Sequence, residues 1–298
     1  MTGTGRWAER FRRMAAERAI WLVVNAASGS NDEDALAALE ACCGDNGLRV
    51  ASRTVFPDEP LPAAAELAAS GIAVVAVFTG DGTINSLLGE LAGWDGEVLV
   101  LPGGTMNLLY HRLHGDRPME EVIAAFARGE AERRRPSVVR AAAGTGYAGI
   151  LAGPGTSWGR VREAMREAAV VELAESAIEA IDETLTGEMI RCAAPPLGRH
   201  EGYPLLCLEP GPQAIEVVAY HAETAAEYLE QGWALVRRNF REGPHEVLGN
   251  APKLRLASTR GNPFGLLIDG EQAEAAPETE FVLATAEVDL VATCRDGA

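Results

Sequence analysis

Three short, mainly apolar runs in the first half of the chain are each followed by a polar loop rich in glycine. The runs are Ile20–Val24, Ile72–Phe78 and Glu97–Leu101, and stretches with helical spacing of apolar residues lie between them. The run Ile72–Phe78 has no polar residue on either face, which is typical of a central strand in a parallel sheet. This alternation predicts an α/β domain of the doubly wound, Rossmann-like type, with a mostly parallel sheet covered by helices on both faces.

The pattern changes after Arg133–Pro136, where shorter, Gly- and Pro-punctuated segments follow. A length of 298 residues suggests about two domains. We therefore expect a nucleotide-binding α/β domain over residues 1–136 and a β-rich, sandwich-like, antiparallel domain over residues 137–285, with a cleft between them. Whether residues 286–298 pack back on the first domain stays open, and we interpret Arg133–Arg135 as a solvated hinge.

The second domain is expected to contain mainly strands. The expected strands are Val138–Ala143, Tyr147–Leu151, Leu205–Leu208, Ile215–Tyr220, Lys253–Ser258, Gly265–Asp269 and Phe281–Thr285, and Ser157–Ala169 is expected to be a helix.

The polar loops have the composition of an anion site. They span residues 25–29, 79–85 and 102–107, directly after the three apolar runs. In an open parallel sheet the carboxyl ends of the strands form the ligand site. Glycine lets the backbone approach a phosphate closely, and Thr83 or Thr105 can cap a following helix whose N-terminus favours an anion. Asp81 adds a carboxylate, which suits a Mg²⁺ ion that accompanies phosphates.

Two Gly-x-Thr-x-Asn elements, Gly82–Asn85 and Gly104–Asn107, follow consecutive strands, and this repetition indicates a nucleotide site. Two common alternatives fail. A P-loop needs a lysine after its last glycine, but Lys253 is the single lysine and lies elsewhere. A dinucleotide-binding GxGxxG fingerprint fails because Asn85 stands where the third glycine belongs.

Charge and cysteine usage exclude other classes. A net charge of −17 argues against a nucleic-acid partner, because a polyanion would be repelled. The five cysteines lack metal-ligand spacing, so we expect a reduced, cytoplasmic protein without zinc. No apolar run approaches the roughly 18 residues that span a bilayer.

The loops together resemble the diacylglycerol kinase catalytic-domain family, which includes bacterial lipid kinases and sphingosine kinases and shares its nucleotide fold with NAD kinases. Its signatures are an Asn-Pro-x-Ser-Gly loop, a Gly-Gly-Asp-Gly-Thr-x-Asn loop, a Pro-x-Gly-Thr-x-Asn-Asp loop and a later Asp-Gly-Glu. This chain is similar at Asn25–Gly29, Thr79–Asn85, Pro102–Asn107 and Asp269–Glu271, in the same order.

The resemblance implies an ATP-dependent, Mg²⁺-assisted transfer of a phosphoryl group to a lipid hydroxyl. Glu271 would be the general base, Asp81 would hold Mg²⁺ and orient the γ-phosphate, and Asp269 would support the local charge network. The implied nucleotide-binding residues are Asn25, Ser28, Gly29, Thr54, Thr79, Gly80, Gly82, Thr83, Asn85, Gly104, Thr105 and Asn107.

The chain departs from the family at several positions. Ala26 and Ser30 replace a proline and a frequent basic residue, Thr79 replaces a glycine, Leu108 an aspartate and His111 an arginine. The changes at positions 30, 79 and 108 leave open a catalytically silent regulator that binds nucleotide or lipid. The shared nucleotide fold leaves open a second alternative to an active lipid kinase, an NAD kinase-like enzyme.

Two segments have the composition of a membrane-contacting surface, and a membrane is where the protein would meet a lipid substrate. Residues 6–18 combine Trp7, Phe11 and Met14 with five arginines, and residues 233–241 combine Trp233 and Phe240 with three more. Each pattern is typical either of peripheral attachment to anionic lipid or of an ordinary amphipathic helix. The sequence leaves that choice, and a homodimer, open.

Overall fold

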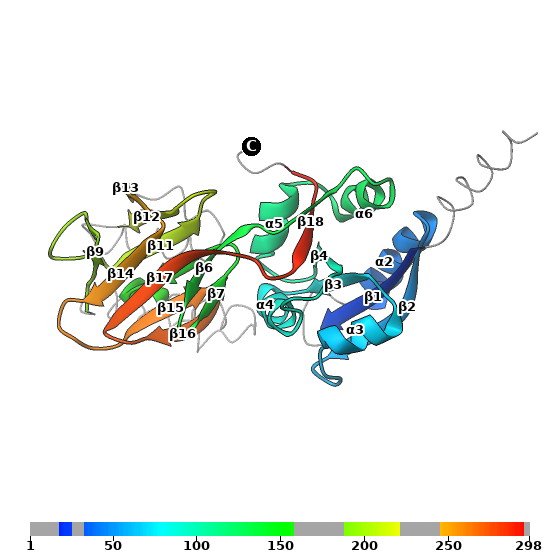
Figure 1. The fold of residues 1–298 in the computed structure, drawn as a ribbon, viewed down its shortest axis with the longest axis horizontal. Helices are drawn as coiled ribbons and strands as arrows, with labels where there is room; N and C mark the ends of the chain where they lie inside the picture. Colours follow the sequence, from blue (N-terminus) through cyan, green and yellow to red (C-terminus); the bar gives the residue numbers. More distant parts are fainter. Residues whose placement is uncertain (1–17, 26–32, 158–187, 221–244, 295–298) are drawn as a thin grey trace, which may run out of the picture. The chain divides into compact units, whose positions relative to one another are not determined.

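The computed structural model describes residues 18–25, 33–157, 188–220 and 245–294. The chain divides into two units, Met1–Arg135 together with Glu287–Ala298, and Pro136–Ala286. Figure 1 shows the path of the chain from blue to red.

A six-stranded sheet forms the centre of the first unit. Its order is β2 (Leu48–Phe56), β1 (Arg18–Asn25), β3 (Val74–Thr79), β4 (Glu97–Pro102), β18 (Asp289–Ala292) and β5 (Glu132–Arg134). All neighbouring pairs are parallel except β18 and β5. Every residue of β3 is buried, as expected for a central strand between two layers.

Helices separate these strands in the sequence. They are α2 (Glu33–Asp45), α3 (Ala64–Ser70), α4 (Asp81–Glu90), α5 (Leu108–His114) and α6 (Met119–Ala127). The predicted mixed α/β architecture with a mostly parallel sheet is therefore confirmed. Among the described residues, no helix is both long enough and apolar enough to span a bilayer.

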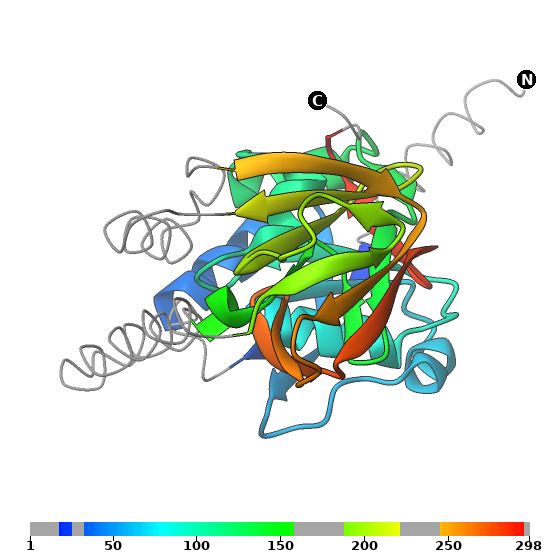
Figure 2. The same ribbon diagram turned by 90° about the vertical axis from the view of Figure 1, so that its left-hand side faces the viewer.

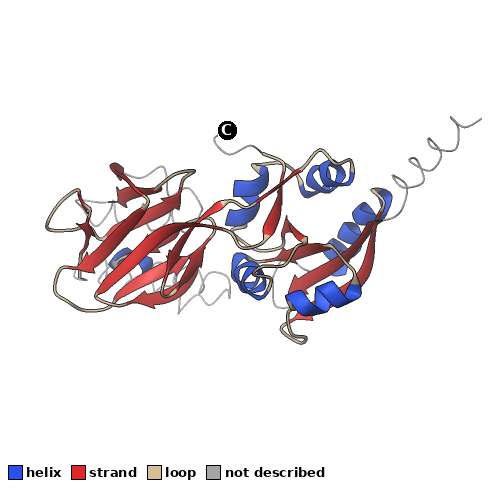
Figure 3. Cartoon of the chain, viewed as in Figure 1, coloured by secondary structure: helices blue, strands red, loops and turns tan. Residues whose placement is uncertain are grey.

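The described residues of the second unit form two six-stranded sheets and one short 3₁₀ helix, η1 (Pro154–Ser157), and Figure 3 colours the strands red. One sheet has the order β10 (Pro196–Leu197), β9 (Ile190–Ala194), β14 (Lys253–Ser258), β17 (Glu278–Thr285), β6 (Ser137–Ala141) and β7 (Gly144–Gly146). The other has the order β13 (His245–Ala251), β12 (Ile215–Tyr220), β11 (Leu205–Pro210), β8 (Ile150–Ala152), β15 (Phe264–Ile268) and β16 (Glu271–Ala275).

Buried side chains of these two sheets form one apolar cluster. Leu256 of β14 and Phe281 of β17 belong to it, as do Leu206 of β11 and Ile268 of β15 in the other sheet. All the pairings are antiparallel, so the expectation of a β-rich region is confirmed, and the sheets lie one behind the other in Figure 2. The cleft expected between the domains stays a prediction.

One expectation about local structure is wrong, and a second falls outside the described residues and stays a prediction. The strand expected over Tyr147–Leu151 is limited to Ile150–Ala152, because the amides of residues 147–149 donate to the side chain of Asp269 and not to a neighbouring strand. The helix expected over Ser157–Ala169 lies almost wholly outside the described residues.

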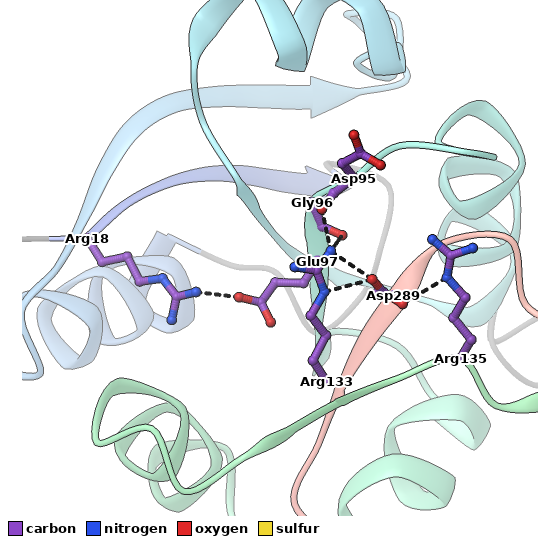
Figure 4. A network of polar contacts seen from close by, with 7 residues as sticks. All are labelled: Arg18, Asp95, Gly96, Glu97, Arg133, Arg135 and Asp289. Atoms are coloured by element: carbon purple, nitrogen blue, oxygen red, sulfur yellow. Dashed lines mark hydrogen bonds and ion pairs between the residues drawn. The ribbon is translucent and has the colours of Figure 1, made fainter.

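Arg133–Arg135 lies where the first unit ends, with Arg133 and Arg135 exposed, but Arg133 and Arg134 also belong to β5 and pair with β18. Asp289, the first residue of β18, accepts hydrogen bonds from Arg133 Nε at 2.7 Å and Arg135 Nε at 2.8 Å, and Arg133 also reaches the carbonyl of Gly96 (Figure 4). Burial works to raise the pKa of Asp289, but the hydrogen bonds from the two arginines outweigh it and the pKa is lowered. An ion pair between Arg18 and Glu97 joins the starts of β1 and β4. This network therefore ties the amino ends of three strands.

Candidate functional site

The carboxyl ends of β1, β3 and β4 meet at one edge of the first sheet, opposite the network of Figure 4. Asn25, the last residue of β1, donates a hydrogen bond from Nδ2 to Oγ1 of Thr83 at 2.9 Å. Since Thr83 lies in the first turn of α4, this bond connects the first loop to the second. Ser28 and Gly29 lie outside the described residues.

Glycine is required where the second loop meets the third. A Cβ atom at Gly104 would lie 2.5 Å from the Cα of Gly80, and one at Gly103 would lie 2.5 Å from the backbone of Phe78 and Thr79. Real Cβ atoms do not approach other atoms this closely, so any side chain there would push the loops apart. The glycines predicted to admit a phosphate thus also let two loops pack backbone against backbone.

Asp81 links the same two loops through its carboxylate. Its Oδ2 accepts the amide of Leu108 at 3.1 Å and its Oδ1 accepts the amide of Leu109 at 3.2 Å. These are the first two residues of α5, so a carboxylate from α4 satisfies amides that a helix N-terminus otherwise leaves without partners. Asp81 is only 7% exposed.

The expected helix caps are wrong at both positions. The N-cap of α4 is Gly80, and Thr83 lies inside the first turn. The N-cap of α5 is Asn107 and not Thr105. Asn107 adopts the left-handed conformation (φ 51°), which asparagine tolerates better than most residues, and its Oδ1 accepts the amide of Gly104 at 2.8 Å. The amide of Gly104 and the first two amides of α5 therefore already have hydrogen-bond acceptors within the protein.

The N-terminus of α4 has the features that favour an anion. Its first turn carries the amides of Gly82 and Thr83, which have no acceptor within the helix. The helix dipole places partial positive charge at the same point. Asn85, one turn further along α4, is half-buried, and Thr105 is exposed in the third loop.

Two predicted nucleotide-binding threonines turn their side chains inward. Thr54 is 4% exposed, and its hydroxyl accepts a hydrogen bond from the indole nitrogen of Trp21 at 3.0 Å. Thr79 is completely buried, and its hydroxyl donates to the carbonyl of Gly80 at 3.2 Å. Both side chains therefore stabilise the sheet edge from within.

The Asp-Gly-Glu motif lies in the second unit, in the hairpin that joins β15 to β16. Ile268 pairs with Glu271, so Asp269 and Gly270 form a two-residue turn. Both have positive φ, 48° and 90°, as a type I′ turn requires. Asp269 is 4% exposed and its carboxylate accepts three backbone amides, whereas Glu271 is exposed at the start of β16.

The structure thus brings Asn25, Gly80, Asp81, Thr83, Gly104 and Asn107 together within the first unit. Asp269 and Glu271 belong to the other unit. Sequence reasoning missed Gly103 and Trp21. The Gly-Gly pair after Pro102 was a usable signal for Gly103, but nothing in the sequence indicated the bond from Trp21 to Thr54. No group of three or more candidate metal-ligating side chains occurs in the part of the chain that the structure describes.

Residues 19–139 match the family model described as diacylglycerol kinase catalytic domain, which confirms the resemblance inferred from the loops. A search of curated proteins returns no match to the chain. Glu271 lies outside the matched segment.

Solved structures agree with the fold. A Bacillus anthracis str. Sterne structure, provisionally assigned as a diacylglycerol kinase, is 13% identical with a TM-score of 0.57, over 92% of this chain and 97% of the other. A second one from that organism, described as a diacylglycerol kinase, is 12% identical with the same TM-score and coverage. Identities this low establish the fold alone.

Proposed function

We propose that this protein is an ATP-dependent lipid kinase that transfers the γ-phosphoryl group to a hydroxyl of a diacylglycerol-like lipid. One observation carries the proposal: the loops after β3 and β4 are joined at the N-terminus of α4 by the glycine contact and by Asp81. The match of residues 19–139 to the diacylglycerol kinase catalytic domain supports a lipid as acceptor.

The nucleotide would bind through backbone groups. The amides of Gly82 and Thr83 and the dipole of α4 attract phosphate oxygens, and the loop pair, joined before the ligand arrives, loses little entropy on binding. Positioning and charge neutralisation are most of what phosphoryl transfer needs from a protein.

The residues fit a Mg²⁺ ion that arrives with the nucleotide. Mg²⁺ in such sites is typically held by one or two carboxylates together with substrate phosphates. Asp81 is one carboxylate at the correct edge, and its two oxygens lie where the loops after β3 and β4 meet, since they accept the amides of Leu108 and Leu109. When bound, the ion would neutralise charge on the phosphate oxygens.

Glu271 would act as the general base. Its carboxylate accepts the proton of the lipid hydroxyl as that oxygen bonds to the γ-phosphorus, and the bond to the bridging oxygen of ADP breaks. The side chain is exposed, and no hydrogen bond or ion pair to it occurs among the residues that the structure describes. An accessible carboxylate without such a partner is suited to receiving a proton.

The test is transfer of radiolabel from γ-labelled ATP to an organic-soluble product, with a panel of diacylglycerols and other lipid alcohols in mixed micelles. We expect labelled lipid with the wild-type protein and at least a hundredfold lower turnover with Glu271→Gln, with ATP affinity changed less than twofold. Glutamine keeps the volume of glutamate but cannot take the proton.

The control is Glu274→Gln, the same exchange at an exposed position on the same strand, which should keep full turnover. Conversion of NAD to NADP without labelled lipid would favour the NAD kinase-like alternative. ATP binding without transfer to any acceptor would favour a silent regulator. Either result contradicts the proposal.

A further inference from the structure

The turn at Asp269 does not by itself need an acid. A type I′ turn requires two residues with positive φ, and Asn-Gly meets that requirement at least as well as Asp-Gly. Asp269 and Gly270 have φ of 48° and 90°, so the backbone explains why these positions hold small, left-handed-tolerant residues. The negative charge of Asp269 needs a separate explanation.

The contacts of the Asp269 carboxylate explain why this position holds an acid. Oδ2 of Asp269 accepts the amide of Tyr147 at 2.8 Å, and Oδ1 accepts the amides of Ala148 at 2.7 Å and Gly149 at 3.1 Å. The amide of Asp269 in turn donates to the carbonyl of Gly149 at 3.1 Å. Three successive amides converging on one anion is the arrangement by which protein backbones bind phosphate and other anions. Here a side chain of the chain itself is that anion.

These bonds fix the hairpin to the segment before β8. Residues 147–149 lead directly into β8, which pairs with β15. Asp269 follows β15 and precedes Glu271 by two residues, so the carboxylate ties the end of β15 to the start of β8. Hydrogen bonds to an ionised carboxylate are stronger than those between neutral groups.

We infer that Asp269 is a positioning residue, which holds the backbone at Gly270 and Glu271 so that the Glu271 carboxylate is presented in one place. This inference rests on the proposed function only in taking Glu271 as the base. The Asp269 side chain itself, 4% exposed and with both oxygens bonded to amides, handles neither the proton nor a metal.

Asp269→Asn tests this sharply. Asparagine has the same size and suits a type I′ turn, so the exchange preserves the turn and removes only the charge and one acceptor oxygen. We expect kcat to fall at least tenfold while KM for ATP and ATP affinity change less than twofold. Hydrogen exchange at the amides of Tyr147, Ala148 and Gly149 should become at least tenfold faster. The acidic limb of the pH profile of kcat/KM should also move.

Two variants make the result specific. Asp289→Asn removes a comparably bonded carboxylate from the first unit, so it should lower the unfolding temperature without moving the pH profile. Glu271→Gln should abolish turnover while leaving exchange at residues 147–149 unchanged.

The inference is overturned if Asp269→Asn keeps more than half of kcat, or if exchange at residues 147–149 is unaltered. Equal losses of ATP affinity and kcat also overturn it, because they would place Asp269 in nucleotide binding. If the wild type phosphorylates no acceptor, the proposed function fails, and the exchange data still decide whether Asp269 holds the turn.

Discussion

At the scale of single residues, three acids predicted to take different parts in one reaction occupy different surroundings. Asp81 accepts two amides at the start of α5, and Asp269 accepts three before β8. Glu271 is exposed. A carboxylate that satisfies buried amides stabilises local structure, whereas one in solvent can exchange protons with a substrate. The residue type was therefore a weaker guide to role than the amides around it.

Asp81→Asn separates the bonds of Asp81 to the first amides of α5 from its proposed role as a ligand of Mg²⁺. Asparagine has one acceptor oxygen in place of two, so one of the Leu108 and Leu109 amides loses its partner, which costs about 1–3 kcal/mol of stability. In isothermal titrations with Mg²⁺ we expect ATP to bind at least tenfold more weakly. With EDTA we expect the loss to be less than threefold.

Asp289→Asn, which leaves this edge of the sheet intact, is the control and should bind ATP normally under both conditions. Equal weakening with and without Mg²⁺ would show that Asp81 acts only by joining the loops. Unchanged binding in both titrations would remove it from the nucleotide site.

The sequence was sufficient for the positions of the loops but not for their contacts. Asn25, the Gly80–Thr83 turn and Gly104 could be predicted to meet because parallel strands end at a common edge. The hydrogen bonds from Asp81 to the first amides of α5 were not predictable, because they depend on the residue at which that helix begins. Thr105 was expected to cap it, but α5 starts three residues later, after a left-handed Asn107.

At the scale of elements, the close contact between the loops after β3 and β4 predicts that replacing glycine by alanine has opposite effects on stability at Gly104 and at Gly89. In Gly104→Ala the new Cβ would lie 2.5 Å from the Cα of Gly80, so the loops must separate. We expect a loss of about 1–3 kcal/mol in stability. ATP affinity should fall about tenfold, because ligand groups displaced by a fraction of an ångström lose their geometry. Thermal unfolding and ATP titration measure the two effects.

Gly89→Ala is the matched control on α4. Nothing lies within 4 Å of a Cβ at this position. Alanine is a better helix former than glycine, so stability should rise by about 0.5–1 kcal/mol with ATP affinity unchanged. If Gly104→Ala behaves like Gly89→Ala, the two loops do not need to touch.

At the scale of the whole molecule, the chain leaves the first unit at Arg135 and returns to it at Glu287. The returning strand β18 pairs with β4 and β5 inside the first sheet, with Leu290 and Val291 buried. The sequence left this return open because four residues are too short to show a periodicity that identifies a partner. The partner of Arg133 and Arg135 was not predictable either, because Asp289 lies more than 150 residues away in the sequence.

His114 makes the return of the chain sensitive to acid. It is fully buried on α5, and its Nδ1 lies 3.0 Å from the hydroxyl of Thr293, just after β18. Burial lowers its pKa from 6.5 to about 4. Between these values the unfolded chain binds a proton that the folded chain does not, so stability falls as the pH drops from about 6.5 to about 4, by up to about 3 kcal/mol.

Urea unfolding of wild type and His114→Leu at about pH 7 and about pH 4.5 measures this. Leucine cannot be protonated, so the variant should lose about 2–3 kcal/mol less than the wild type on acidification. His200→Gln, at an exposed position, should follow the wild type. The same pH dependence in wild type and His114→Leu would mean that His114 is protonated in the folded protein and that the contact with Thr293 tolerates the charge.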